Sequence, residues 1–238
     1  MKHMRCWSGV LLAAALAACS AVPPQPDTAA EASLDAPASW QHFPLPGKRS
    51  TVYSAQRMDA RDAVRAQANG SASLWRQPLQ VAPDDLGRLH FSWKVPMLIA
   101  SANLAVRETD DAPVRIVLAF DGDRSKWSTK SQALSDLALA LTGEALPYAT
   151  LMYVWSNDQP TESVILNPRT DRIRKIVVES GDGNLGRWLD YERDVRADYE
   201  RAFGEAPGAL LSVALMTDAD NTQSQTLAWY GPVRLNPR

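Results

Sequence analysis

Short runs in which apolar and polar residues alternate are the feature of this sequence that most restricts its fold. The clearest run places Leu89, Phe91, Trp93 and Val95 at every second position. A period of two puts alternate side chains on opposite faces of a β-strand, so this run predicts a strand with one buried face. Similar or continuous apolar runs predict further strands at 51–55, 63–68, 71–79, 114–120, 148–155, 163–166, 172–179, 209–217 and 226–235.

Two segments have the period of a helix instead. We expect Ser131 to cap the first helix and Gly143 to end it, and Asp194 and Gly204 to delimit the second. The apolar faces expected to pack on the rest of the domain are Ala133, Leu134, Leu137, Ala138 and Leu141 in the first helix, and Val195, Tyr199 and Phe203 in the second. Many short strands without an internal repeat predict a single domain over residues 40–238, folded as a sandwich or a barrel.

The N-terminus has the order of a secretory signal. Basic residues precede an apolar run from Trp7 to Ala18, which is shorter than the roughly 20 residues that a membrane-spanning helix needs. The run ends in Leu16-Ala17-Ala18-Cys19, which resembles the bacterial lipobox, where cleavage takes place before an acylated cysteine. We therefore expect residues 1–18 to be a lipoprotein signal peptide and Cys19 to be lipidated.

The residues after Cys19 extend this expectation. Ser20 favours transfer to the outer membrane, where the protein would face the periplasm. Residues 19–39 are rich in Pro, Ala and Ser, so we expect the lipidated cysteine to be followed by a flexible tether. About twenty residues of such a chain span roughly 25 Å. The expected partner at this end of the protein is the membrane, held through the lipid anchor.

The charge balance argues against nucleic acid as a partner. The chain has 25 Lys and Arg and 27 Asp and Glu, a formal net charge of −2, whereas nucleic-acid binders are usually basic. A dinucleotide-like pattern, Gly-Asp-Gly-Asn-Leu-Gly at 181–186, puts Asp182 where a pyrophosphate would lie. Asp218 is also farther from this pattern than the roughly 20 residues usual for a ribose contact. We expect no nucleotide cofactor.

Asp218, Asp220 and Asn221 form a run of oxygen-bearing side chains at the end of a predicted strand. The run is not an EF-hand loop, because its sixth and twelfth residues are Gln223 and Trp229 rather than Gly and Glu. A turn capped by its own Asp and Asn side chains is one interpretation. A calcium site of another type, with Asp218 and Asp220 as ligands, is the alternative, and no other cofactor is expected.

Arg115 carries a specific expectation. On the predicted strand 114–120 it points away from Val114 and Ile116, among apolar neighbours, where a guanidinium needs a carboxylate in a forked pair. The strand-end residues that could supply this carboxylate are Asp110, Asp111, Asp218 and Asp220. The pair would either tie two loops together or line a ligand site on the concave face of the sandwich.

Aromatic and polar side chains near strand ends and loops are the other candidates for ligand binding. Flat aromatic faces stack on sugar rings, although the same residues also fill cores. The candidate ligand-binding residues are Arg115, Asp121, Trp127, Tyr153, Trp155, Asp218, Asp220, Asn221 and Tyr230. No catalytic residue is assigned, because paired carboxylates meet in space rather than in sequence.

Longer motifs carry a resemblance to a known family. They read LPGKRSTVY, DDAPVRIVLAFDGD, LPYATLMYVW, ERDVRADYERAFGE and MTDADNTQSQTLAWYG. Together they resemble the bacterial family catalogued as domain of unknown function 3047, over nearly all of residues 40–236. The resemblance implies an exported one-domain β protein and brings no known activity.

The end of the sequence is similar to that of carbohydrate-binding jelly rolls, with Asp-x-Asp-Asn-Thr between two predicted strands, the second of which ends in Trp229-Tyr230-Gly231. This similarity implies a mainly β fold, a jelly-roll-like antiparallel β-sandwich of the galactose-binding-like type with two short helices. We expect a non-catalytic module that binds a glycan or another cell-envelope polymer. The alternatives are an envelope hydrolase or lyase that uses paired carboxylates, and a scaffold that binds another envelope protein.

Overall fold

The computed structural model describes residues 39–238, so the expected signal peptide, lipidated Cys19 and tether lie outside the described residues. The α-helices are α1 (Thr129–Thr142) and α2 (Val195–Phe203). The strands are β1 (Gln41–Pro44), β2 (Val52–Met58), β3 (Arg61–Asn69), β4 (Ser73–Val81), β5 (Arg88–Lys94), β6 (Ala112–Phe120), β7 (Ala149–Ser156), β8 (Val164–Leu166), β9 (Ile173–Ser180), β10 (Trp188–Asp194), β11 (Leu210–Asp218), β12 (Gln225–Tyr230) and β13 (Arg234–Asn236).

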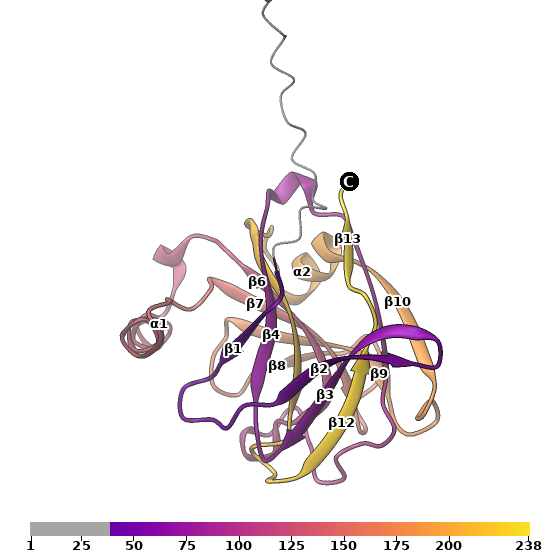
Figure 1. Ribbon diagram of the computed structural model, residues 1–238. Helices are drawn as coiled ribbons and strands as arrows, with labels where there is room; N and C mark the ends of the chain where they lie inside the picture. The colour runs from indigo at the N-terminus through magenta and orange to yellow at the C-terminus, as the bar shows by residue number, and fades with distance from the viewer. Residues whose placement is uncertain (1–38) are drawn as a thin grey trace, which may run out of the picture. The chain divides into compact units, whose positions relative to one another are not determined.

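The strands form two sheets (Figure 1). Sheet A has the order β1-β4-β11-β6-β7-β9-β8, and sheet B has the order β10-β5-β12-β3-β2 with β13 paired to β5. The mainly β architecture with two sheets and two α-helices is as predicted. The expectation of an antiparallel sandwich needs one correction, because β7 and β9 run parallel. The hairpin of β8 and β9 follows β7, and it is the second strand of this hairpin that lies beside β7.

The core lies between the inner faces of the two sheets. Leu89, Phe91 and Trp93 of β5 are at most 3% exposed, as the alternation predicts. Opposite them, Val114, Ile116, Leu118 and Phe120 of β6 are fully buried. An aromatic pair also joins the two sheets: the ring of Phe91 stacks on that of Tyr153 of β7 at 5.5 Å between centroids. Trp93 therefore belongs to the core and not to a binding face.

Helix α2 matches its prediction. The Asp194 carboxylate accepts a hydrogen bond from the Ala197 N–H at 3.0 Å, and Gly204 follows the helix with a φ of 71°. Val195 and Tyr199 are fully buried, and Phe203 packs against the same core. A cap, an apolar stripe and a closing glycine thus place this short helix as the sequence indicates.

Helix α1 differs from its prediction in two ways. Ser128, rather than Ser131, is the N-cap, because its Oγ accepts from the Ser131 N–H. The helix also turns Ser131 and Ser135 towards the protein and leaves Leu137 and Leu141 exposed. The expected packing face is therefore wrong. In the described part of the chain, no helix has the length and apolar character needed to cross a bilayer.

The predicted strand 226–235 is interrupted. β12 ends at Tyr230 and β13 begins at Arg234, and the Gly231 N–H bonds to the Ser92 carbonyl between them. A Cβ atom at Gly231 would lie 2.1 Å from the Ser92 Oγ, so a larger residue here would require the serine hydroxyl to rotate away. β1 and β10 are strands that sequence alternation misses, since both mix half-buried and exposed residues along their length.

Candidate functional site

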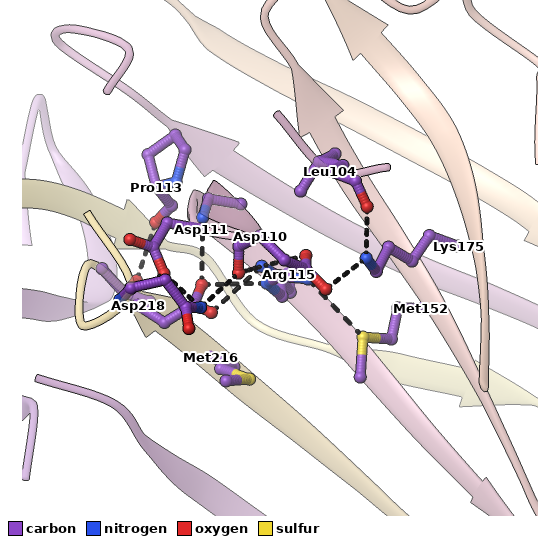
Figure 2. A network of polar contacts seen from close by, with 12 residues as sticks. Leu104, Asp110, Asp111, Pro113, Arg115, Met152, Lys175, Met216 and Asp218 are labelled. Carbon is purple, nitrogen blue, oxygen red and sulfur yellow. Dashed lines mark hydrogen bonds and ion pairs between the residues drawn. The ribbon is translucent and has the colours of Figure 1, made fainter. Parts of the chain in front are cut away.

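Arg115 and Asp218 form the forked pair that the sequence predicts (Figure 2). Arg115 Nε donates to Asp218 Oδ1 at 2.9 Å, and a terminal nitrogen donates to Asp218 Oδ2 at 3.0 Å. Arg115 lies on the outer face of sheet A, yet it is only 2% exposed, and Asp218 is 3% exposed. Burial opposes the charge on Arg115, but the two carboxylates of Asp218 and Asp110 raise its pKa above the usual value. The pair ties β6 to β11 and leaves no open wall for a ligand.

Asp110 extends this pair into a network that also holds Lys175. The Asp110 carboxylate accepts from Arg115 at 3.1 Å and from Lys175 Nζ at 2.6 Å, and Lys175 also donates to the Leu104 carbonyl at 2.6 Å (Figure 2). Burial alone would raise the pKa of Asp110, but Arg115 and Lys175 bring it below the usual value. Burial and the nearby Arg115 lower the pKa of Lys175 to about 8. Sequence reasoning missed Lys175, because its partners come from a distant loop.

Burial also perturbs the carboxylate of Asp218. Desolvation raises the pKa of Asp218 to about 6, although Arg115 opposes the shift. Asp218 Oδ1 also accepts from the Ala112 N–H at 3.0 Å. Next to Ala112, the ladder between β6 and β11 has a bulge, and the freed Arg115 N–H donates to the Tyr230 hydroxyl at 3.2 Å. The network thus closes an irregular end of the sheet.

Asp111 holds the turn that contains Asn221. Its Oδ1 accepts from the backbone and side-chain nitrogens of Asn221 at 3.2 and 3.0 Å, and its Oδ2 accepts from the backbone nitrogen and hydroxyl of Thr222 at 2.7 Å each. Carboxylate oxygens of Asp111, Asp218 and Asp220 lie within 4.8 Å of one another. Asp220 pairs with Lys48. Because these oxygens already face N–H, O–H and ammonium donors, the calcium site remains only a prediction.

Tyr153, Trp155 and Tyr230 lie in the core, which corrects their place among the ligand-binding candidates. Each is at most 1% exposed. The Tyr153 hydroxyl donates to Asp198 at 2.9 Å, the Trp155 indole to the Gly181 carbonyl at 2.9 Å, and the Tyr230 hydroxyl to the Met216 carbonyl at 2.6 Å. Alternation turns these rings inward on β7 and β12, so a ligand on the surface does not reach them.

Trp127 and Asp121 lie near the surface beside α1. The rings of Trp127 and Tyr148 are parallel within 1° at 6.2 Å between centroids, and the guanidinium of Arg124 lies 4.6 Å from the Trp127 ring centroid. Trp127 therefore has protein stacked on its ring and offers little free surface to a sugar. Asp121 is exposed and is not joined to the network of Arg115.

The Gly-rich segment 181–186 is a turn between β9 and β10, with Gly181 and Gly186 at φ values of 72° and 73°. A dinucleotide site would need a helix N-terminus directly after it, and a strand follows instead. The segment therefore lacks the strand–turn–helix order of a dinucleotide fingerprint.

An open pit lies elsewhere, on the outer face of sheet B. It encloses about 390 Å³, within the usual range for small-ligand sites. Its lining residues are Arg61, Asp62, His90, Phe91, Ser92, Asp190, Tyr191, Pro232 and Arg234. They come from three strands and from the interrupted segment before and within β13. No single sequence motif spans these positions, so sequence reasoning missed the pit.

The polar groups of the pit are held in place by the fold. The Arg61 guanidinium donates to both oxygens of Asp190 at 2.7 and 3.2 Å and lies 5.2 Å from the Trp188 ring centroid. His90 Nε2 lies 3.1 Å from the Asn236 side-chain nitrogen, within hydrogen-bond distance. Such contacts orient donors and acceptors before a ligand arrives, which lowers the entropy cost of binding.

Comparisons with known proteins give a family and a distant fold neighbour. A family model described as "Protein of unknown function (DUF3047)" matches residues 38–234. A search of curated proteins finds no match. Among solved structures, the chain is similar to the xyloglucanase domain of NopAA, a type three effector from Sinorhizobium fredii, in complex with cellobiose. That likeness has a TM-score of 0.44 and 8% identity, and covers 84% of this chain and 98% of the other. Likeness at this level carries no information about the ligand of this chain.

Proposed function

Because the chain belongs to the DUF3047 family, whose function is unknown, we propose a function from its own surface and its N-terminal sequence. The protein is a lipoprotein of the outer membrane that faces the periplasm and binds a glycan or another envelope polymer without changing it chemically. The pit on sheet B is its binding site.

The observation that carries the proposal is the mixture of fixed donors and acceptors around the pit. Arg61, His90 and Arg234 supply N–H groups, while Asp62 and Asp190 supply carboxylate oxygens. Sugar hydroxyls both donate and accept hydrogen bonds, so a wall that offers both kinds of group suits them better than a wall of one charge. A pit of about 390 Å³ accommodates part of a polymer whose remainder stays in solvent.

Cleavage of the polymer by a hydrolase or lyase that uses paired carboxylates is the second candidate, since Asp62 and Asp190 both line the pit. A general acid of this kind needs a raised pKa, usually from burial or from a second carboxylate. Asp190 instead shares its two oxygens with Arg61. Asp218, whose pKa burial raises to about 6, is sealed inside the protein. The pit therefore supports binding better than catalysis.

A glycan array with the mature chain, run with and without calcium, tests the proposal. Arg61→Ala and Asp62→Asn should each weaken binding at least about tenfold, because each removes a charged partner of the ligand. Arg107→Ala is the matched control, as Arg107 is exposed in the short 3₁₀ helix before β6 and lies outside the pit. Arg61 forms an exposed ion pair and a contact with the Trp188 ring, so its loss should cost no more than about 2 kcal/mol of stability. Full binding by both pit variants would refute the site.

The membrane part of the proposal has its own test. Cys19→Ser should release or mis-sort the protein, because acyl chains contribute about 0.8 kcal/mol per buried CH₂ and supply nearly all the membrane affinity. Cell fractionation with antibody detection follows the protein. A variant that stays in the outer-membrane fraction like the unchanged chain would show that Cys19 is not the anchor.

A further inference from the structure

Helix α1 presents its apolar stripe to solvent. Leu134, Leu137 and Leu141 share one side of the helix by their spacing of three and four residues. Leu137 is 55% and Leu141 63% exposed, and Leu134 is half-buried. Leu146, just after the helix, is 40% exposed. We name Leu134, Leu137, Leu141 and Leu146 the leucine face.

Polar contacts fix this orientation. The Ser131 hydroxyl donates to Asp171 at 3.3 Å, and the Ser135 hydroxyl accepts from Arg124 at 3.4 Å and from the Leu146 N–H at 3.2 Å. Both serines are at most 5% exposed. The helix is therefore attached by its serine side, and a rotation that would bury the leucines would break these bonds. Several leucines exposed together on one stripe mark a contact surface.

The first turn of α1 adds positive charge beside the leucine face. A hollow of about 330 Å³ there is lined by Lys130, Arg169 and Arg174 and by a single carboxylate, Asp171. Lys130 also lies on the same side of the helix as Leu134 and Leu137, one turn before them. An apolar stripe with cations at its end is complementary to an anionic lipid surface, where leucines enter the acyl boundary and cations meet phosphate.

The chain enters the described domain close to this helix. Gln41, at the start of β1, is paired with Arg76 of β4. Arg76 in turn donates to both oxygens of Glu144 at 2.7 and 2.9 Å, two residues after the end of α1. The tether expected between Cys19 and β1 would span about 25 Å. An anchor at Cys19 would thus hold the end of α1 within reach of the bilayer.

We propose that α1 lies against the anionic surface of the membrane that carries the protein, with the leucine face in the lipid and Lys130 at the headgroups. The proposal rests on the expected anchor for its geometry and is independent of the pit. Membrane contact through α1 fixes the orientation of the domain, which a tether alone leaves free.

Fluorescence quenching by lipid tests this contact without relying on acylation. The chain from Ser20 onwards carries a histidine tag in place of Cys19 and is held on vesicles by nickel-chelating lipid. Removal of residues 1–19 leaves no cysteine, so Leu141→Cys gives a single site for an environment-sensitive dye. Ser54→Cys, exposed on β2 of sheet B, is the matched control. The vesicles contain phosphatidylethanolamine, phosphatidylglycerol and, in one arm, brominated acyl chains.

We expect brominated lipid to reduce emission at position 141 at least roughly twofold and to leave position 54 unchanged. Lys130→Glu should weaken the quenching at position 141, because it reverses the charge beside the headgroups. Equal emission at positions 141 and 54 would overturn the proposal. So would dye-to-dye quenching at position 141 that is insensitive to brominated lipid, because it would show a second copy of the chain on the leucine face.

Discussion

Arg115 donates to two carboxylates, to the Asp110 carbonyl and to the Met152 sulfur, so almost the whole guanidinium is used inside the protein. Arg115→Met should lower the free energy of unfolding by about 3–5 kcal/mol, because it leaves Asp218 buried without its forked partner. Chemical denaturation measures the loss. Arg57→Met is the control, since Arg57 is exposed and bonds only to the nearby Ala60 carbonyl. An unchanged midpoint for Arg115→Met would contradict a structural role.

The lowered pKa of Lys175 predicts how the stability of the protein depends on pH. Burial lowers its pKa from 10.5 to about 8 in the folded protein, so between these values the unfolded chain binds more protons than the folded one. Stability must therefore rise with pH across this window, and the cost of burying the charge is fully present below pH 8.

Comparison with Lys175→Met isolates this effect. The free energy of unfolding of the unchanged protein, minus that of the variant, should increase from about pH 8 to 10.5, because other titrating groups cancel in the difference. Urea denaturation at stepped pH gives both values. A flat difference would mean that Lys175 keeps an ordinary pKa.

For single residues, the sequence predicts whether a side chain is buried better than it predicts which groups that side chain contacts. Alternation along β6 shows that Arg115 needs a carboxylate, and Asp218 is among the four that the sequence offers. Lys175 also lies among the buried residues of its strand. Its partners Leu104 and Asp110 belong to a loop more than sixty residues away, so the sequence does not point to them. Tyr153, Trp155 and Tyr230 show the limit for aromatics, since core and binding rings look alike in sequence.

Among the helices and strands, α1 shows where the spacing of apolar residues fails to predict the buried face. β5, β6 and α2 bury the faces that their spacing predicts. Helix α1 has an equally regular stripe, yet it docks through Ser131 and Ser135 because Arg124 and Asp171 supply polar partners there. Periodicity finds an apolar face but does not reveal whether protein, lipid or solvent lies against it.

The hairpin of β2 and β3 offers a stability test. Its turn residues Asp59 and Ala60 have φ values of 51° and 63°, the left-handed region that alanine adopts at a cost. Ala60→Gly should therefore raise the free energy of unfolding by about 0.5–1 kcal/mol, as judged by thermal or urea denaturation. Ala55→Gly, within β2, is the control and should lower it by a similar amount. A loss at position 60 would show that the turn is not strained.

The fold of the whole molecule brings together pit residues that no single segment of the sequence contains. The pit joins residues of β3, β5, β10 and β13, which are far apart in sequence and adjacent only after sheet B has formed. Composition and alternation predict the sandwich, because burial acts on each strand separately. They do not predict the pit, because its position depends on strand order and on the interruption between β12 and β13.

Added calcium tests whether Asp111, Asp218 and Asp220 form a metal site in the intact protein. We expect the melting temperature to be the same in calcium and in chelator, because Asp111 and Asp218 already accept hydrogen bonds from protein donors. A ligand that binds only the folded state at 100 times its dissociation constant would add about 2.7 kcal/mol. Differential scanning calorimetry detects such a shift, and a clear rise in calcium would establish a metal site at these residues.

Strand order also dictates when this domain can fold. β11 lies between β4 and β6 in sheet A, and β12 lies between β5 and β3 in sheet B, so each sheet receives an inner strand from the end of the chain. Until Leu210 and the residues after it are available, neither sheet can be completed, and the earlier strands lack a partner on one side. We therefore expect a nascent chain to complete neither sheet until nearly all of it has been made. If the expected signal peptide directs export, this delay would keep the polypeptide in a form that passes through a narrow channel until translocation is nearly finished.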